Sequence, residues 1–370
     1  MRTTGLALIL ALLMMALTGC RVSGELENQA YVLVLGLDRE PGGALNLTAK
    51  VPQIGKSGDS SEASGGEYLL FTGSGDDWPQ ALEALEQATP RQMNLSHIEM
   101  LVVSETLARQ EGFATLANRV AETPHLYTTA RFVVCEGRAR DFIDAQETVI
   151  GTRLSSEIDA MLDHYAEHGY IPEASFADAC YAMSSFYADP VAIHGSLASE
   201  DQAAAALTRP PEMPSGEASP MAQRYSGAVL FRSGRMVGTL SPAQTALLSL
   251  IRGGRIALPV ECSGKRYALT PEGAPQRHVL FEDDRLTLRV DARFSTPDDL
   301  CDADARALEA ILEADMAGVI AACQSLETDP FGFAEAASGR FSTLDEWRAW
   351  RWDQRYASAA VDVRITICRS

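Results

Sequence analysis

The sequence has few basic residues for its length. Its 370 residues include 31 Lys and Arg against 50 Asp and Glu, which gives a formal net charge of -19. A protein that holds DNA or RNA by neutralising phosphates needs a basic face, so this charge excludes nucleic acid as a partner. Aromatic residues make up only 7% of the chain and are not interleaved with Arg or Lys, which also argues against a base-stacking platform.

The common signatures of catalysis and cofactor binding are missing too. The chain contains no GxGxxG, no GxSxG, and no GxxxxGK followed by Ser or Thr. We therefore expect no catalytic residue, no cofactor and no bound metal. One short match remains, because His164, Glu167 and His168 have the HxxEH form of an inverted zinc peptidase. Three fixed positions at an expected helix end are a weak signal, and an exported zinc hydrolase is the less favoured alternative.

The cysteines are spread out, and no CxxC pair supports a zinc site. Six cysteines follow Cys20, an even number that permits disulfide bonds in an exported protein. Because they are far apart in the chain, we expect most of them to be buried thiols. One or two disulfide bonds remain an alternative. The six are Cys135, Cys180, Cys262, Cys301, Cys323 and Cys368.

Long hydrophobic runs are absent, and the longest apolar stretch stands at the start of the chain. Residues 6–17 are uncharged and apolar and follow the basic Met1-Arg2 pair, a pattern typical of a signal peptide. Leu17-Thr18-Gly19-Cys20 then forms a bacterial lipobox. The alternative is an ordinary buried cysteine after a secretion signal. We predict instead that Cys20 receives a diacylglyceryl group and anchors the mature protein to a membrane, outside the cytoplasm.

Apolar strands and amphipathic helices alternate irregularly, which predicts an α+β (mixed α/β) protein with two to three small mixed-sheet domains. A stretch rich in Ala and Pro has the composition of a linker between domains. The predicted divisions are a signal peptide at 1–20, an N-terminal mixed α/β domain at 21–198, a linker at 199–224, a small middle domain at 225–272, and a C-terminal α+β domain at 273–370 built as strand, long helix and strand.

The individual elements follow from hydrophobic periodicity and from turn residues. The best-specified helix begins after Ser241, because Pro242 and Gln244 complete a capping box. Strands are expected at 30–37, 44–52, 100–103, 128–135, 225–232, 235–239, 256–260, 284–294 and 360–367. Helices are expected at 76–88, 151–168, 175–187, 241–252 and 302–326.

Two clusters near the C-terminus have alternative interpretations. Four aspartates within 298–304 lack the glycine and glutamate of an EF-hand loop, so we expect them to cap the following helix rather than to bind calcium. Three tryptophans within 347–352 either form a binding surface or cover the core, and we favour the core.

Taken together, separated segments of the chain resemble the C-subunit lipoproteins of spore germinant receptors, the GerAC or Ger(x)C family. The segments keep the family's order over nearly the whole mature chain. They are the lipobox at 17–20 with the acidic stretch 25–27 and the strand 34–38, then 97–108, then 226–231, 236–240 and 241–254, and finally 329–333 with the tryptophan segment and the last strand.

The resemblance implies a lipoprotein without enzymatic activity on the outer face of the spore inner membrane. It also implies two integral-membrane partners, the A- and B-type receptor subunits, in a complex that responds to small nutrients during germination. We therefore expect a lipid-anchored subunit of a nutrient germinant receptor, attached through Cys20. A solute-binding lipoprotein of a transporter is the alternative, although such proteins normally have two similar lobes and the two halves here differ.

Overall fold

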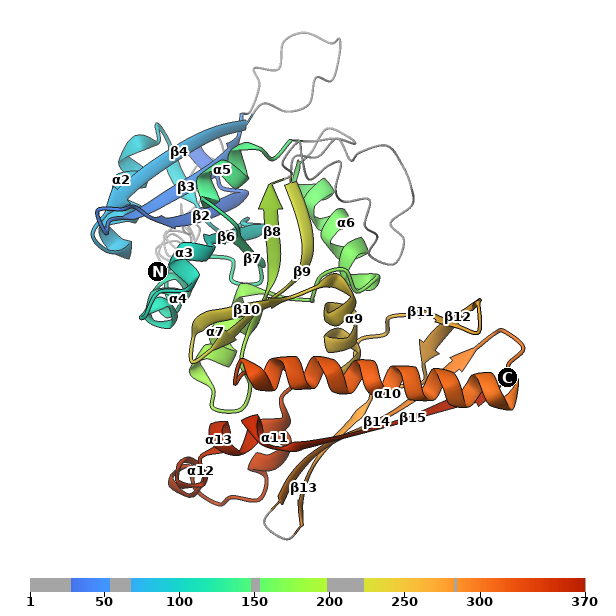
Figure 1. Ribbon diagram of the computed structural model, residues 1–370. Coiled ribbons are helices and arrows are strands. Elements are labelled where there is room, and N and C mark those ends of the chain that lie inside the picture. The colour runs from blue at the N-terminus through green and yellow to red at the C-terminus, as the bar shows by residue number, and fades with distance from the viewer. Residues whose placement is uncertain (1–27, 54–67, 148–153, 198–222, 283–284, 370) are drawn as a thin grey trace, which may run out of the picture.

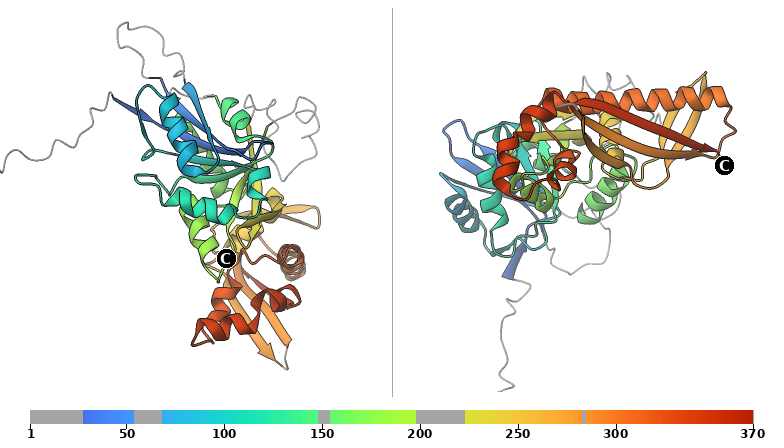
Figure 2. Two further views of the ribbon diagram at one scale, coloured as in Figure 1. Left: turned by 90° about the vertical axis from the view of Figure 1, so that its left-hand side faces the viewer. Right: turned by 90° about the horizontal axis from the view of Figure 1, so that it is seen from below.

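The computed structural model describes residues 28–53, 68–147, 154–197, 223–282 and 285–369. Helices pack against two larger sheets, so the expected mixed α/β class is confirmed (Figure 1). The left view in Figure 2 shows the N-terminal half stacked on the C-terminal half.

An eight-stranded sheet organises the N-terminal half. In spatial order it contains β10 (Arg235–Leu240), β9 (Gln223–Arg232), β8 (Val191–Leu197), β7 (Arg131–Cys135), β6 (Met100–Ser104), β2 (Val34–Arg39), β3 (Leu45–Pro52) and β4 (Tyr68–Gly75). The four central strands from β8 to β2 are parallel, and the strands outside them are antiparallel to their neighbours. Parallel strands in a sheet that is covered on both faces are expected to consist almost entirely of apolar residues. Strands β6 and β7 have this composition.

Helices cover both faces of this sheet, because successive side chains of a strand point to opposite sides. Met100 and Val102 of β6 belong to one hydrophobic cluster, and Leu101 and Val103 belong to the other. The first face is covered by α5 (Ala139–Asp144), α6 (Leu154–Glu167) and α9 (Pro242–Ile251). The second face is covered by α2 (Trp78–Ala88), α3 (Glu105–Ala108), α4 (Phe113–Ala121) and α7 (Phe176–Ser184), and a small separate sheet pairs β1 (Gln29–Tyr31) with β5 (Gln92–Asn94).

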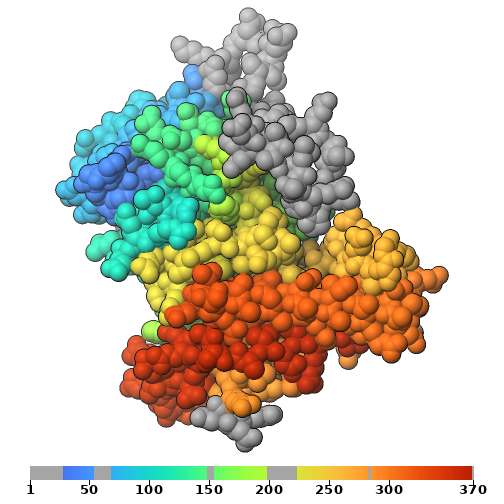
Figure 3. Space-filling view, in the orientation of Figure 1, coloured from blue at the N-terminus to red at the C-terminus, as the bar shows by residue number. Residues whose placement is uncertain are grey.

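A five-stranded sheet organises the C-terminal half. It contains β11 (Leu258–Cys262), β12 (Lys265–Pro271), β14 (Arg285–Thr296), β13 (Gln276–Glu282) and β15 (Ala360–Arg369). The long helix α10 (Asp302–Ser325) connects β14 to β15, and these two strands are parallel. The expected strand, long helix and strand are therefore present, and Figure 3 shows α10 as a ridge across the molecule.

The helix α10 also protects the outer edge of β15. Glu313 and Glu309 lie one turn apart on α10 and accept hydrogen bonds from the backbone N–H groups of Ile365 and Ile367, at 3.1 and 3.0 Å. A strand edge whose N–H groups are already bonded is a poor template for another strand.

Two helix starts bear on the sequence predictions. Ser241 and Gln244 form the predicted capping box of α9. The N-cap of α10 is Cys301 and not one of the aspartates. Its sulfur accepts a hydrogen bond from the backbone N–H of Asp304 at 3.3 Å. Asp302 and Asp304 lie in the first turn of this helix, where carboxylates complement the helix dipole.

The tryptophans cover the core, as predicted from the sequence: two are buried in it, and Trp350 packs against it. Three short helices follow α10, namely α11 (Phe333–Ser338), α12 (Leu344–Trp350) and α13 (Trp352–Ala357). Trp347 and Trp352 are 5% and 6% exposed, and their ring centroids are 5.8 Å apart. Trp350 packs against Phe281 of β13 with ring centroids 5.0 Å apart.

The expected middle domain at 225–272 does not have a sheet of its own. β9 and β10 extend the N-terminal sheet through the pairing of β9 with β8, whereas β11 and β12 join the C-terminal sheet. One hydrophobic cluster includes Val34, Leu250 and Phe294, so the two halves share a core. Local composition does not mark such long-range pairing. The expected linker lies almost wholly outside the described residues, and the domain boundaries remain predictions.

Candidate functional site

The predicted lipidation site, Cys20, lies outside the described residues, and its acylation remains a prediction. Among the helices that the structure describes, none is long and apolar enough to cross a membrane. The six cysteines after Cys20 are free thiols, and four of them are buried, as expected of most of them.

The HxxEH residues lie at the exposed carboxyl-terminal end of α6. The rings of His164 and His168 are 4.3 Å apart, and the Nδ1 atom of His168 is 2.8 Å from the backbone oxygen of His164. Within the described ranges, no group of three or more His, Cys, Asp or Glu side chains is arranged to hold a metal ion. His168 instead lines a largely apolar hollow of about 320 Å³ between α6, α9, β11 and α10.

A larger and more polar pocket lies where β2, β6 and β7 end. These three strands are parallel, so their carboxyl ends share one edge of the sheet. The chain leaves β6 into α3, whose Leu107 packs on one face, and leaves β7 into α5, whose Phe142 packs on the other. Neighbouring strands whose connections leave toward opposite faces create a crevice, the usual place for ligands in open α/β sheets.

The pocket has a volume of about 670 Å³ and is lined by residues from all three strand ends. β2 and the turn after it provide Arg39, Glu40, Pro41 and Gly43, the segment after β6 provides Thr106 and Gln110, and the loop after β7 provides Arg138. No local pattern marks this pocket in the sequence, because its residues come from three separate segments.

A side chain of the sheet holds the amino-terminal end of α5, and this contact also positions Arg138. The carboxylate of Asp38, which is 3% exposed, accepts hydrogen bonds from the backbone N–H groups of Ala139 at 2.8 Å and Arg140 at 3.0 Å. These N–H groups have no partner within the helix, so a side-chain acceptor stabilises the helix start. Arg138 is the N-cap residue of α5, and its position therefore follows from the bonds to Asp38.

The sheet also holds α5 by its carboxyl-terminal end. The Lys50 ammonium on β3 donates to the backbone oxygens of Ile143, at 2.9 Å, and Gln146. Burial lowers the pKa of Lys50 to about 8, and the nearby carboxylates of Asp144 and Glu147 oppose this shift. A cation among the last carbonyls of a helix also complements the helix dipole. Two buried side chains of opposite charge therefore fix both ends of this short helix.

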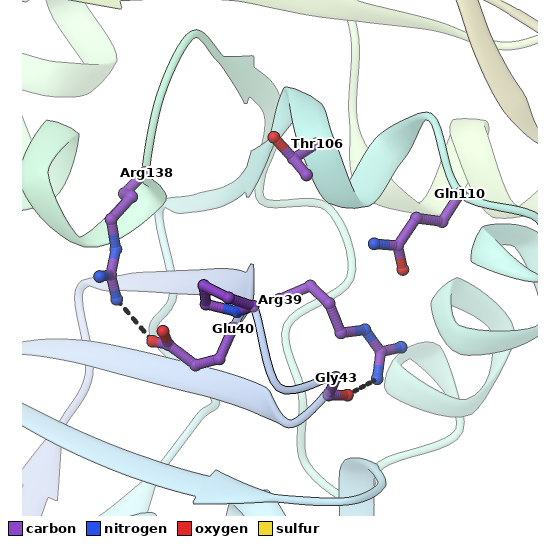
Figure 4. Close-up of a pocket in the computed structure, with 7 residues that line it drawn as sticks. Arg39, Glu40, Gly43, Thr106, Gln110 and Arg138 are labelled. Carbon is purple, nitrogen blue, oxygen red and sulfur yellow. Dashed lines mark hydrogen bonds and ion pairs between the residues drawn. The ribbon is translucent and has the colours of Figure 1, made fainter.

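The charges around the pocket are only partly balanced. Arg138 forms an ion pair with Glu40 at 2.6 Å, whereas the Arg39 Nη1 atom donates to the backbone oxygen of Gly43 at 2.7 Å (Figure 4). In Figure 4 the Arg39 guanidinium and the Gln110 amide lie on one side, and the Arg138–Glu40 pair lies on the other. Across the described ranges, Arg39 forms no ion pair with a carboxylate, so the side chains that line the pocket carry one more positive charge than negative.

Two family models match successive parts of the chain. The model described as "Spore germination protein N-terminal domain" matches residues 23–194. The model described as "Spore germination B3/GerAC like, C-terminal" matches residues 226–369. The second match begins within β9, at residue 226, although β9 and β10 belong to the N-terminal sheet.

Two proteins of Bacillus subtilis (strain 168) are similar in sequence. "Putative spore germination protein YfkR" is 21% identical over 376 aligned residues, which cover 95% of this chain and 92% of that protein. "Spore germination protein KC" is 22% identical over 191 residues, which cover 50% of this chain and 47% of that protein.

A solved structure supports the fold. The crystal structure of the GerBC protein matches with a TM-score of 0.51 and 16% identity, and the match covers 90% of this chain and 96% of that one. At this identity the likeness shows a common fold. Because the two family models together match most of the chain, in order, the protein belongs to the GerAC family of spore germination proteins.

Proposed function

We propose that this chain is the lipid-anchored, non-enzymatic C subunit of a nutrient germinant receptor, on the outer face of the spore inner membrane. The observation that carries the proposal is the order of features along the chain. A lipobox ends at Cys20, and the two GerAC family matches begin at residue 23 and follow each other to residue 369.

The anchor has a physical reason in the charge of the mature chain. Cleavage before Cys20 removes Arg2 and no acidic residue, which leaves 30 basic and 50 acidic residues and a net charge of -20. Anionic lipid headgroups repel such a surface. Each buried acyl methylene contributes about 0.8 kcal/mol, so two chains on Cys20 would hold the protein at the membrane despite this repulsion.

The anchoring test compares two cysteine variants in spores that lack the native gene. Cys20→Ala removes the proposed acylation site, whereas Cys301→Ser changes an exposed cysteine and keeps an acceptor at the N-cap of α10. We expect Cys20→Ala to leave the inner-membrane fraction and to lose incorporation of a labelled fatty acid, and Cys301→Ser to keep both. Full membrane retention of the Cys20 variant would overturn the anchor.

The receptor test compares nutrients with a germination trigger that bypasses receptors. We expect deletion of the gene to abolish the response to at least one nutrient and to leave the bypass response intact. We also expect the tagged full-length chain to co-purify in mild detergent with two integral-membrane subunits of the A and B type. An unchanged response to every nutrient, or purification without both subunits, would overturn this assignment.

A further inference from the structure

The pocket at the ends of β2, β6 and β7 is built mainly from hydrogen-bonding groups. Thr106 and Gln110 add a hydroxyl and an amide to the guanidinium groups of Arg39 and Arg138. A volume of about 670 Å³ exceeds what one or two waters need and suits a molecule of several non-hydrogen atoms. The position at the carboxyl edge of parallel strands is the place where α/β proteins bind ligands.

The charge of the pocket selects for an anion. Glu40 is neutralised by Arg138 at 2.6 Å, so the positive charge of Arg39 is the excess within the lining. A guanidinium has five N–H donors, and the hydrogen bond that the structure shows for Arg39 goes to the neutral backbone oxygen of Gly43. The Nε atom of Arg39 is buried, and the donors on its two Nη atoms that are not bonded to Gly43 match the two oxygens of a carboxylate or the oxygens of a phosphate. Such a site stands out in a chain with a net charge of -19.

Buried hydrogen bonds also hold the walls of the pocket in place. Asp38 and Lys50 fix the two ends of α5 by buried hydrogen bonds, and Arg39 directly follows Asp38 on β2. The two sides of the pocket are thus tied to the same pair of strands. A site that is already ordered loses less conformational freedom when it binds.

From this arrangement we propose that the pocket binds a small oxyanion, a carboxylate or a phosphate group, through Arg39, with Thr106 and Gln110 as neutral hydrogen-bonding partners. The Arg138–Glu40 pair forms the opposite wall and limits the net positive charge. This proposal does not depend on a role of the chain in a germinant receptor, and it concerns a site apart from the lipid anchor.

Isothermal titration calorimetry of the full-length chain in a neutral detergent tests the site. The probes are succinate, inorganic phosphate and the uncharged compound glycerol, each at the same total ionic strength. We expect saturable binding of at least one of the two anions and none of glycerol. A preference for succinate identifies a carboxylate site, and a preference for phosphate identifies a phosphate site. Absence of saturable binding of both anions would overturn the proposal.

Variants then locate the binding. Arg39→Gln removes the unbalanced charge, and Arg109→Gln is the matched control, because Arg109 lies outside the lining and pairs with Glu105 on α3 at 2.6 Å. We expect Arg39→Gln to lower the affinity for the preferred anion by about tenfold or more, and Arg109→Gln to change that affinity by less than about twofold. Equal effects of the two variants would place the anion elsewhere and refute the assignment.

A third variant moves the affinity in the other direction. Glu40→Gln removes the carboxylate beside Arg138 and raises the net charge of the pocket by one unit. We expect the preferred anion to bind about threefold more tightly or better, because like charge no longer opposes it. Variants that only damage the fold cannot produce tighter binding. Weaker binding by Glu40→Gln would contradict the electrostatic argument.

Discussion

Removal of the Asp38 carboxylate tests whether the sheet holds α5 in the way the hydrogen bonds indicate. In Asp38→Ala, the backbone N–H groups of Ala139 and Arg140 lose their acceptor. Ala139 is fully buried, so its N–H has no access to water, and such an unsatisfied donor costs about 1–3 kcal/mol. The lost cap costs about 0.5–2 kcal/mol, and the two effects overlap. We expect the free energy of unfolding to fall by about 2–3 kcal/mol.

Urea unfolding of the full-length chain in neutral detergent, followed by circular dichroism, measures this loss. Asp141→Ala is the matched control, because it removes the same charge from an exposed position in the first turn of α5. That variant should lose only the interaction with the helix dipole, about 0.3–1 kcal/mol. Asp38→Asn keeps one acceptor oxygen, so its loss of unfolding free energy should lie between those of Asp38→Ala and Asp141→Ala. If Asp38→Ala and Asp141→Ala lose the same stability, the buried carboxylate does not hold the helix and the reasoning is refuted.

The packing of α2 on β4, the buried Asp329 and the exposure of Cys301 can each be tested by one measurement. A Cβ atom on Gly73 would stand 2.1 Å from the backbone nitrogen of Leu85, so Gly73→Ala should lower the free energy of unfolding by about 2–3 kcal/mol. Gly318 in α10 has open space around it, so Gly318→Ala should raise the free energy of unfolding by about 0.5–1 kcal/mol, and equal shifts of the two variants in urea unfolding would contradict the packing of α2 on β4. Burial raises the pKa of Asp329 from 3.8 to about 7, so its contribution to stability is complete below pH 3.8 and is lost as the pH rises through 7. Asp329→Asn should therefore flatten the decline of the free energy of unfolding between pH 4 and 8, and an equally steep decline in the variant would contradict the raised pKa. In the native protein a thiol reagent should modify the exposed Cys301 before the four buried cysteines, as mass spectrometry of the labelled chain will show, and simultaneous labelling would contradict their burial.

The elements that could be predicted have a local physical cause. The capping box at Ser241 and Gln244 lies within four residues of sequence, and the apolar stripe of α10 repeats with the period of a helix. Strands with uninterrupted apolar residues, such as β6, are also visible, because both faces of a parallel strand are buried.

The elements that the sequence analysis missed have weak local signals for reasons that the structure shows. Strand β4 contains Gly73 and Gly75, which weaken a strand pattern, but a Cβ atom at either position would stand within 2.4 Å of the backbone of α2. The glycines therefore permit the helix to approach the sheet. Likewise, the pairing of β9 with β8 joins strands on the two sides of the expected linker, and no local property specifies it.

The Gly36-Leu37-Asp38 sequence, part of the resemblance to the GerAC family, has a structural explanation. A Cβ atom on Gly36 would stand 2.5 Å from the Cδ1 atom of Ile143, so glycine lets α5 pack closely on β2. Leu37 is buried on the opposite face, and Asp38 caps the same helix. The motif thus specifies how α5 docks, and the proposed anion site depends on this docking because Arg138 lies at the start of α5.

The junction of the two halves depends on the buried Asp329 and the partly buried Asp189. The backbone N–H of Asp329 donates to the Asp189 carboxylate at 2.8 Å, and the backbone N–H of Asp189 donates to the backbone oxygen of Asp329 at 3.0 Å. The Asp329 carboxylate accepts three further backbone N–H groups, at residues 332–334, where α11 begins. Asp189 belongs to the first family match and Asp329 to the second. Separation of the matched regions would remove these reciprocal bonds and divide the shared hydrophobic cluster, so neither region is expected to keep its native surface when expressed alone.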